Sequence, residues 1–223
     1  MNLNNLKKLS GDASYRSFYR KKNLKNSSVI IYCKKQKKSN LLIYDAINNL
    51  LIKKKLLAPK MINHNYYKNY IEIEDFGDLT AFQLIKKQNV NKLSCYKKII
   101  LLLKKIQKIE TKKIKTFLNT QYKIPDYSKK KLIDEAKLFL QWYLPNFIKG
   151  KKQNIEKKKI LKIFKNLINK LIYEKKFFVH RDFHVSNIMI TKKGLGLIDS
   201  QDAVFGNIAY DLASLIDDVR FRT

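Results

Sequence analysis

One stretch of the sequence decides the fold: His180-Arg181-Asp182-Phe183-His184-Val185-Ser186-Asn187, followed by Gly196-Leu197-Ile198-Asp199. Apolar runs at residues 177–179 and 188–190 flank the first part, and Lys193-Gly194 offers a turn before residues 195–198. Short apolar runs bounded by turn residues are typical of strands. The pattern predicts a strand, a loop and a β-hairpin that together bring Asp182, Asn187 and Asp199 to one end.

The spacing of these side chains indicates phosphoryl-transfer chemistry. A His-Arg-Asp sequence with Asn five positions after the Asp fits a kinase catalytic loop, in which the Asp receives the proton of a substrate hydroxyl. We therefore predict Asp182, flanked by His180 and Arg181, as the catalytic group. Asn187 and Asp199 offer oxygen ligands that suit Mg²⁺ bound partly through nucleotide phosphates. The tripeptide alone could recur by chance in a polar loop, but Asn187 and Asp199 in register favour the kinase interpretation.

Length and composition limit the possible number of domains, membrane spans and cellular compartments. A chain of 223 residues can fold as one domain or as two lobes. No stretch approaches about 18 uninterrupted apolar residues, so we expect no membrane span. The first ten residues contain no long apolar block or small-residue cleavage site. We therefore expect a cytoplasmic protein in which Cys33 and Cys95 are reduced thiols.

The net charge of +30 would ordinarily suggest nucleic acid or an anionic membrane as a partner. Here the lysines are spread along the whole chain, beside abundant Asn, Ile, Tyr and Phe. All five residue types have A/T-rich codons, so genome-wide drift explains the pattern without a ligand. We interpret the lysine runs as solvated faces and do not expect nucleic acid or a membrane as a partner.

The first third of the chain predicts a small β-rich unit. We expect a short helix or lead-in at residues 4–9, strands at 15–20, 29–33 and 70–74, and a helix at 41–55. Asp45 on this helix sits where an acid could pair with a lysine, and we favour a surface acid. Residues 10–14 form a loop of small residues between strands. Backbone N–H groups of such a loop could lie over a triphosphate, and a plain hairpin is the alternative. Lys34 or Lys35 could reach the α and β phosphates.

Residues 75–78 break the strand pattern and mark a hinge whose backbone would face an adenine ring. Beyond it, helices are predicted at residues 81–87, 93–109, 126–144 and 154–174. On the third of these, Leu138, Phe139 and Trp142 are expected in the core, while Glu135 on their flank is a candidate for binding a substrate hydroxyl. Asp211 could cap a last helix at 212–219. We favour the alternative that Asp211 accepts hydrogen bonds from the catalytic-loop backbone.

The whole chain resembles the aminoglycoside phosphotransferase-like branch of the protein-kinase fold. Within that branch it looks similar to the anomeric sugar kinases that phosphorylate N-acetylmuramate and N-acetylglucosamine in bacterial cell-wall recycling. The catalytic and metal loops described above carry the resemblance to the superfamily. Further motifs that carry it are Asp12-Ala13-Ser14-Tyr15-Arg16, Glu74-Asp75-Phe76-Gly77-Asp78, Glu135, Leu138-Phe139, Trp142-Tyr143-Leu144, Asp199-Ser200-Gln201-Asp202-Ala203, Tyr210-Asp211-Leu212 and Ser214-Leu215.

The resemblance implies an α+β, two-lobed fold, with an N-lobe at residues 1–77 and a C-lobe at residues 78–223. It implies an ATP- and Mg²⁺-dependent small-molecule kinase with Asp182 as the base and Asn187 and Asp199 as metal ligands. A loop at residues 11–17, which includes Asp12, Ala13, Ser14 and Tyr15, would cover ATP. Glu74, Asp75 and Phe76 would contact adenine. Glu135, Asp202 and His184 would lie near the sugar, and Asp211 would support the loop.

Three departures from these sugar kinases leave the function open in part. Val185-Ser186 stands where they tend to have Ser-Arg, the segment after the third strand is lysine-rich, and the chain stops at Thr223, so we expect a shortened C-lobe. One alternative is a kinase for another small acceptor, such as an aminoglycoside, choline or homoserine. A second is a kinase-fold binding protein without turnover, using its basic surface on RNA.

Overall fold

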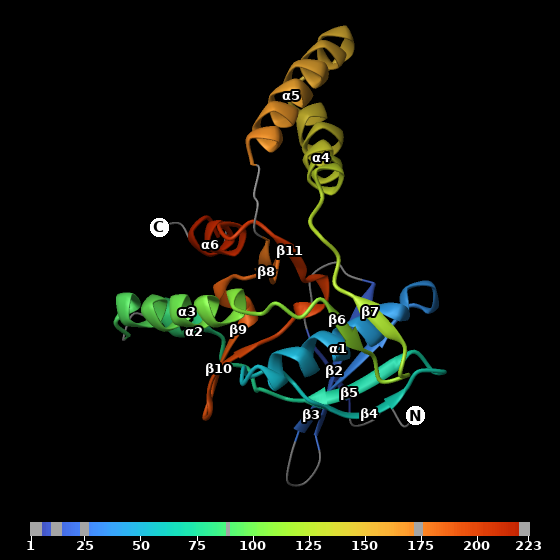
Figure 1. The fold of residues 1–223 in the computed structure, drawn as a ribbon, viewed down its shortest axis with the longest axis vertical. Coiled ribbons are helices and arrows are strands. Elements are labelled where there is room, and N and C mark those ends of the chain that lie inside the picture. Colours follow the sequence, from blue (N-terminus) through green and yellow to red (C-terminus); the bar gives the residue numbers. More distant parts are fainter. Residues whose placement is uncertain (1–5, 10–14, 23–26, 88–89, 172–175, 219–223) are drawn as a thin grey trace.

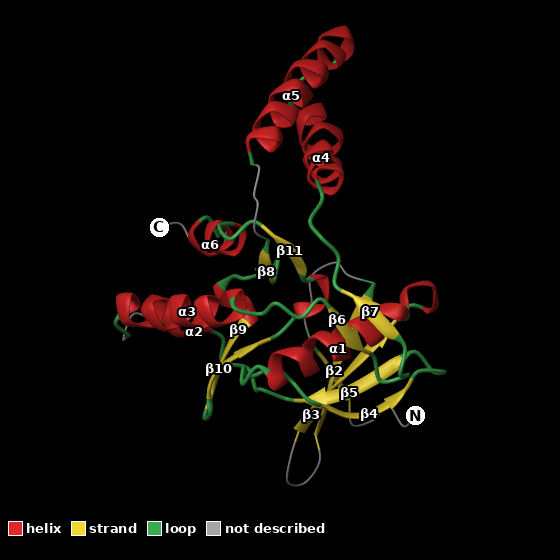
Figure 2. Cartoon of the chain, in the orientation of Figure 1, coloured by secondary structure: helices red, strands yellow, loops and turns green. Residues whose placement is uncertain are grey.

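The computed structural model describes residues 6–9, 15–22, 27–87, 90–171 and 176–218. It opens with a five-stranded antiparallel sheet in the order β1, β2, β3, β5, β4 (Figure 1 and Figure 2). The strands are β1 (Leu6–Lys8), β2 (Arg16–Lys22), β3 (Ser27–Cys33), β4 (Met61–Asn65) and β5 (Tyr70–Glu74). The helix expected at residues 4–9 is wrong, because residues 6–8 pair with residues 19–21 as an edge strand.

Helix α1 (Ser39–Lys53) packs on this sheet. Its side chains Leu41 and Tyr44 join Ile31 and Ile71 of the sheet in one buried cluster. Apolar residues spaced by three on α1 lie on one face of the helix, and alternate residues of β5, Ile71 and Ile73, lie on one face of the sheet. These two faces pack against each other. Asp45 is buried rather than on the surface, with 2% of its area exposed. Burial raises the pKa of Asp45 to about 6.

The main core combines residues from both sides of the hinge. It joins α1 to α2 (Ala81–Lys86), α3 (Lys92–Gln107), α6 (Tyr210–Ile216) and the strands around the catalytic loop. Thr80 begins α2 as a capping box, in which its side chain accepts from the Gln83 N–H and its own N–H donates to the Gln83 side chain. The strands here form three antiparallel pairs. Two are hairpins, β6 (Lys113–Lys115) with β7 (Gln121–Lys123) and β9 (Ile188–Thr191) with β10 (Gly194–Leu197). The third pairs β8 (Phe177–Val179) with β11 (Val204–Gly206), on either side of the β9–β10 hairpin in the sequence.

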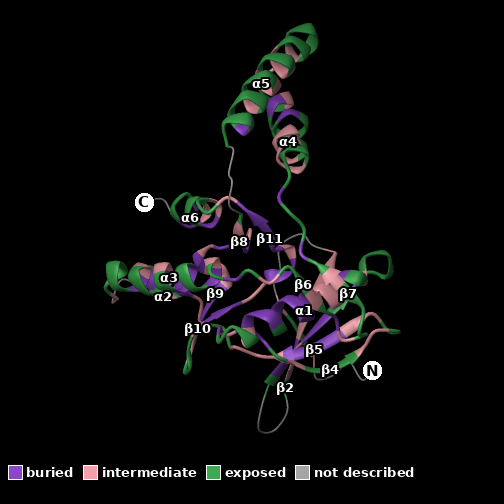
Figure 3. Ribbon diagram, in the orientation of Figure 1, coloured by how far each residue is buried: buried purple, intermediate pink, exposed green. Residues whose placement is uncertain are grey.

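Helices α4 (Lys129–Leu138) and α5 (Gly150–Lys170) form an antiparallel pair that projects from the rest of the molecule (Figure 1). A π-helical turn, Phe139–Tyr143, and a 3-10 turn, Leu144–Asn146, connect them. Most of the pair is exposed (Figure 3). The prediction that Leu138, Phe139 and Trp142 belong to the core is wrong, since they are 50%, 40% and 77% exposed. Among the described residues no helix has both the length and the apolar content needed to cross a bilayer.

Candidate active site

The catalytic loop begins where β8 ends. His180 and Phe183 are fully buried and fix the loop to the core. Asp211, at the start of α6, accepts a hydrogen bond from the His180 N–H at 2.7 Å and one from the Arg181 N–H at 3.0 Å. Two carboxylate oxygens thus hold two consecutive peptide groups directly before Asp182. This arrangement restrains the backbone that presents the Asp182 side chain.

Asn187 joins the loop to the segment after β10 that carries Asp199. Its side-chain Nδ2 donates to the backbone oxygen of Asp182 at 3.1 Å and lies 3.2 Å from Nε2 of His184. Its own backbone oxygen accepts from the Ile198 N–H at 3.2 Å, one residue before Asp199. The structure therefore brings the segments that carry Asp182, Asn187 and Asp199 together at one end of the β9–β10 hairpin.

Asp199 has a left-handed backbone conformation, with φ 65°. Asp tolerates this region better than most residues other than Gly and Asn. The turn that follows is anchored to α1, because the Ser200 hydroxyl donates to the Asn48 side chain at 2.6 Å and both groups are buried. The Asp199 carboxylate lies 3.0 Å from the guanidinium of Arg16 on β2.

Burial and neighbouring charges shift the pKa values of Asp182 and His180 in opposite directions. Burial raises the pKa of Asp182, and the negative charges of Asp199 and Asp202 raise it further. A raised pKa strengthens the proton affinity of a carboxylate, which suits a group that accepts the proton of a hydroxyl. Burial lowers the pKa of His180 to about 4, and His184 adds to the effect, so His180 is neutral near pH 7.

A cavity of about 520 Å³ lies between the sheet and the β9–β10 hairpin. Polar side chains line the cavity in two regions. One region, here called the polar end, is formed by Ser186, Asn187, Asp199 and Arg16, and the other, at the hinge and the start of α2, by Arg20, Glu74, Asp75, Asp78, Thr80 and Gln83. The apolar residues on the walls are Leu9, Phe18, Val29, Tyr44, Pro59, Ile73, Phe76, Met189 and Ile198. A cavity of this kind fits a nucleotide whose base lies among the apolar side chains and whose phosphates meet the polar end.

The side chains at the polar end also suit a Mg²⁺ ion that is bound partly by the protein and partly by nucleotide phosphates. Asn187 and Asp199 could supply two oxygen ligands, and Mg²⁺ bound to phosphates needs only one or two from the protein. No group of three or more His, Cys, Asp or Glu side chains suited to a metal ion occurs in the part of the chain that the structure describes. A metal at this place would therefore take its remaining ligands from phosphate oxygens and water.

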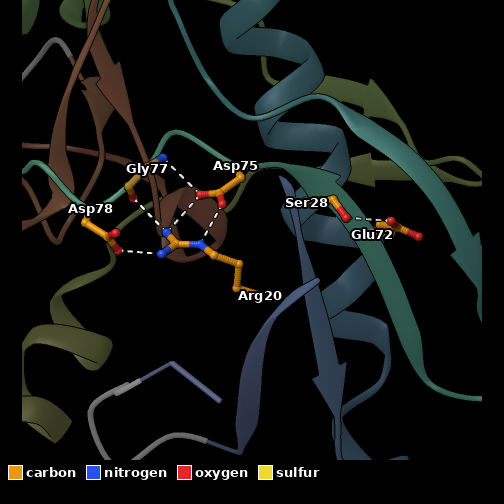
Figure 4. Close-up of polar contacts among 6 residues, drawn as sticks. All are labelled: Arg20, Ser28, Glu72, Asp75, Gly77 and Asp78. Carbon is orange, nitrogen blue, oxygen red and sulfur yellow. Dashed lines mark hydrogen bonds and ion pairs between the residues drawn. The ribbon is translucent and has the colours of Figure 1, made fainter. Parts of the chain in front are cut away.

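The hinge is held to the sheet by Arg20 of β2 (Figure 4). Nε of Arg20 lies 2.6 Å from the Asp75 carboxylate, and its other two nitrogens bond Asp75, Asp78 and the Gly77 carbonyl at 2.6–3.1 Å. Burial alone would raise the pKa of Asp75, but hydrogen bonds from Arg20, Ser27 and the Gly77 N–H outweigh it and lower the pKa. The Asp75 side chain is therefore committed to the hinge itself.

Arg181 ties the catalytic loop to the projecting helices. Its Nη2 donates to Glu135 on α4 at 2.7 Å, and its guanidinium lies over the Tyr127 ring, 5.1 Å from the centroid. The Tyr127 hydroxyl donates to the second oxygen of Glu135. Burial raises the pKa of Tyr127, so it stays a protonated donor. Both oxygens of Glu135, which the sequence suggested for a substrate hydroxyl, are thus engaged within the protein.

The other residues predicted to bind ATP or the substrate differ in how they lie relative to the cavity. Glu74 and Phe76 line the cavity, and Tyr15 lies beside Arg16, with its ring centroid 5.8 Å from the guanidinium carbon. Lys34 is exposed and is not among the residues that line the cavity, so its position gives no support to the predicted phosphate contact. Asp202 accepts from the Gln201 side chain at 2.8 Å. The predicted contacts at Asp12, Ala13 and Ser14 lie outside the described residues.

Sequence reasoning missed the roles of Arg16 and Arg20. A signal was present, because the chain has five arginines among 48 basic residues. In a chain that uses lysine almost everywhere, a retained arginine marks a place where the planar guanidinium is needed. Within the described residues the arginines are Arg16, Arg20 and Arg181, and each forms an ion pair at this site.

Comparisons with known proteins give a family match, two curated relatives and a similar solved structure. Residues 73–223 match the family described as "Phosphotransferase enzyme family". Two curated relatives are named N-acetylmuramate/N-acetylglucosamine kinase. The one from Neisseria meningitidis is 24% identical over 214 residues, covering 94% of this chain and 60% of the relative. The one from Pseudomonas putida is 26% identical over 209 residues, covering 94% and 58%. The chain thus spans about 60% of the length of the curated relatives it matches.

Among solved structures, the ADP-bound aminoglycoside phosphotransferase APH(2'')-Ib is similar over 96% of this chain and 71% of that chain, with a TM-score of 0.62 and 18% identity. At this identity the likeness shows the fold alone. It confirms the α+β, protein-kinase-like fold expected from the sequence, with a β-sheet N-terminal part and a helical C-terminal part.

Proposed function

The chain belongs to the phosphotransferase enzyme family, and from this premise we propose that it transfers a phosphoryl group from ATP to a hydroxyl group of a small molecule. The observation that carries the proposal is the position of Asn187. It bonds the backbone of Asp182 on one side and the residue before Asp199 on the other, at the polar end of a cavity with apolar walls. One asparagine thereby sets the spacing between a base and a metal ligand.

In the proposed reaction each residue has a separate task. Asp182 accepts the proton of the acceptor hydroxyl and orients its oxygen, and its raised pKa favours that uptake. Asp211 holds the loop backbone, and neutral His180 adds no charge beneath it. Asn187 and Asp199 would hold Mg²⁺, which neutralises charge on the phosphates. The backbone of residues 74–77 would receive the adenine, with residues 1–77 acting as the nucleotide-covering lobe and 78–223 as the catalytic lobe.

For the acceptor we propose an amino sugar, N-acetylmuramate or N-acetylglucosamine, phosphorylated at its anomeric hydroxyl. Two observations support this choice: the names of the curated relatives, and the 94% of this chain over which each of them is similar to it. Asp202 and His184 would face the sugar, with Glu135 behind Arg181. We place the reaction in the cytoplasm, where ATP is supplied, and in cell-wall recycling. An aminoglycoside or choline is the second candidate, because the fold is shared with an aminoglycoside phosphotransferase.

The test offers Mg-ATP to the purified chain with N-acetylmuramate, N-acetylglucosamine, kanamycin or choline in separate reactions. Phosphorus NMR of the product shows which oxygen carries the new phosphate. We expect an anomeric phosphate on an amino sugar, and none with Asp182→Asn. Phosphate on kanamycin or choline alone would replace the acceptor proposed here, and ATP binding without transfer to any acceptor would contradict the proposed activity.

A further inference from the structure

The Arg16 side chain lies at the polar end of the cavity, where its neighbours hold it in place. It is the first residue of β2, paired in register with Cys33 at the end of β3. Only 7% of its side chain is exposed, although an isolated arginine is one of the residues least often buried. Its guanidinium carbon lies 5.8 Å and 5.7 Å from the ring centroids of Tyr15 and Phe18. The rings and Asp199 together fix the guanidinium in place.

Strand geometry explains why β2 supplies this group. Side chains two residues apart on a strand share a face, so Arg16, Phe18 and Arg20 point to the same side of the sheet. All three line the cavity. The two arginines lie at opposite ends of the cavity. Arg20 bonds Asp75, Asp78 and Gly77 at the hinge, whereas Arg16 lies at the opposite, acidic end beside Asp199.

The end of the cavity that contains Asp199 needs a cation before it can accept phosphates. Asp199 and Asn187 line it, and the Asn187 side chain donates to the backbone oxygen of Asp182 at 3.1 Å, which places a second acidic residue beside it. A nucleotide triphosphate would add several negative charges. Arg16 and Arg20 are the cationic side chains among the described residues that line the cavity, and Lys34 is not one of them. A guanidinium can donate to a carboxylate and to a phosphate oxygen at the same time, in a planar fork that lysine lacks.

We propose that Arg16 is the phosphate-binding cation of this site: its guanidinium stays against Asp199 and donates to oxygens of the nucleotide phosphates. The inference rests on the proposed function, because it presumes that the cavity takes ATP. A lysine at the end of the third strand, the position of Lys34, is the group the sequence suggested for this task. The structure assigns the task to the neighbouring strand instead, where the side chain is buried and faces the cavity.

The competing explanation is that Arg16 acts only through Asp199, as a structural partner of that carboxylate. Binding experiments separate the two. Calorimetric titration of the purified full chain with ATP and with adenosine, in EDTA, measures nucleotide affinity without metal and without turnover. For Arg16→Met we expect ATP to bind at least about tenfold more weakly and adenosine to bind unchanged, since one charge-assisted phosphate contact is lost. For Lys34→Met we expect both affinities to be unchanged.

The decisive comparison repeats Arg16→Met in an Asp199→Asn background. If Arg16 contacts the ATP phosphates directly, ATP affinity should still fall by about tenfold in that background, because the contact does not depend on the Asp199 carboxylate. An Arg16→Met change without effect in that background would overturn the proposal, as would an equal loss of ATP and adenosine binding or a selective loss in Lys34→Met. If Arg16→Met unfolds, Arg16→Lys keeps the charge and loses the fork. It should then weaken ATP selectively, and unchanged ATP binding would overturn the proposal.

These outcomes keep the two proposals apart. Wild-type protein that binds neither ATP nor ADP would contradict the proposed function, and the role of Arg16 with it. Wild-type protein that binds ATP, with Arg16→Met binding it equally well, would contradict the role of Arg16 alone. Thermal unfolding of each variant, followed by circular dichroism, confirms that a weaker affinity reflects the site and not the fold.

Discussion

Arg181 of the catalytic loop reaches Glu135 on α4, with Nη2 and Oε1 2.7 Å apart. This ion pair connects the residue next to the proposed base with a helix that otherwise projects from the molecule. Tyr127 closes the contact by donating to the other oxygen of Glu135 and by lying under the guanidinium. The position of the α4–α5 pair is thereby coupled to the geometry around Asp182.

The coupling predicts an effect of Glu135→Gln on catalysis. The amide cannot form a charged pair with Arg181 and accept from Tyr127 at the same time, so the loop loses part of its support. We expect kcat to fall about tenfold, because small displacements of a catalytic group are costly, while the KM for ATP is unchanged. Asp134→Asn is the matched control, since Asp134 pairs only with the exposed Lys137 on the same helix. Equal activity in Glu135→Gln and Asp134→Asn would refute the coupling.

The backbone at Arg181 is strained, because its φ of 76° lies in the left-handed region that favours glycine. Alanine at this position keeps the strain and glycine removes it. We therefore expect Arg181→Gly to have a free energy of unfolding about 1 kcal/mol above that of Arg181→Ala, although both lose the contact with Glu135. At Lys97, exposed on the helix α3, the order should reverse, because glycine weakens a helix. Urea unfolding of the four variants measures both differences.

The ion pair of Arg20 and Asp75 predicts a large stability effect at the hinge. Arg20→Met leaves the Asp75 carboxylate, 3% exposed, without its partner. We expect a loss of about 3 kcal/mol in the free energy of unfolding. Adding Asp75→Asn should restore part of this loss, because the buried charge is removed. Lys176→Met is the control, with an expected loss below about 1 kcal/mol, since Lys176 and its partner Asp126 are 38% and 41% exposed. Equal losses in Arg20→Met and Lys176→Met would contradict the role given to Arg20.

His180 predicts how stability changes with pH. Its pKa is lowered from 6.5 to about 4 by burial, so the unfolded chain takes up the proton first as pH falls. Its contribution is therefore complete above pH 6.5 and is lost as pH falls toward 4, by about 3 kcal/mol in all. Asp211 acts in the opposite sense, because burial raises its pKa to about 6 and its contribution is lost as pH rises from about 4 to 6. The two effects partly cancel between pH 4 and 6.

A His180→Phe variant separates the two contributions, because it keeps an aromatic ring beside Phe183 and retains Asp211. We expect the wild type to lose more stability than the variant between pH 7 and pH 4.5. Urea unfolding at several pH values in this range measures the difference. Parallel curves for the two proteins would show that folding does not lower the pKa of His180, and a wild type that gains stability relative to the variant would show that folding raises it.

Much of the fold could be predicted because its signals are local. The alternating residues of β5 and the capping residue Thr80 of α2 locate those elements at their observed starts. The catalytic loop was placed between its strands for the same reason. Residues 6–8 were assigned wrongly because three residues with lysines carry no period of their own, and the partner strand β2 determines their conformation.

The errors at the site have a different cause. Periodicity identifies an apolar face but not what covers it, so Trp142 was expected in the core and is 77% exposed. Asp45 and Glu135 were judged by residue type alone, yet their surroundings come from residues distant in the sequence. The same holds for the pair of Arg16 and Asp199, which are 183 positions apart, and for Arg20 at the hinge. Such pairs depend on tertiary contacts and become visible only in the folded chain.

The most direct test of the central claim is the rate of ATP-dependent phosphorylation of N-acetylglucosamine by the wild type and by Asp182→Asn, with product detected by phosphorus NMR. The substitution keeps the size of the side chain and removes its ability to accept a proton. We predict transfer by the wild type and a rate at least about a hundredfold lower for Asp182→Asn, with ATP affinity unchanged. Equal rates for the two proteins would contradict the assignment of Asp182 as the base, and with it the proposed site.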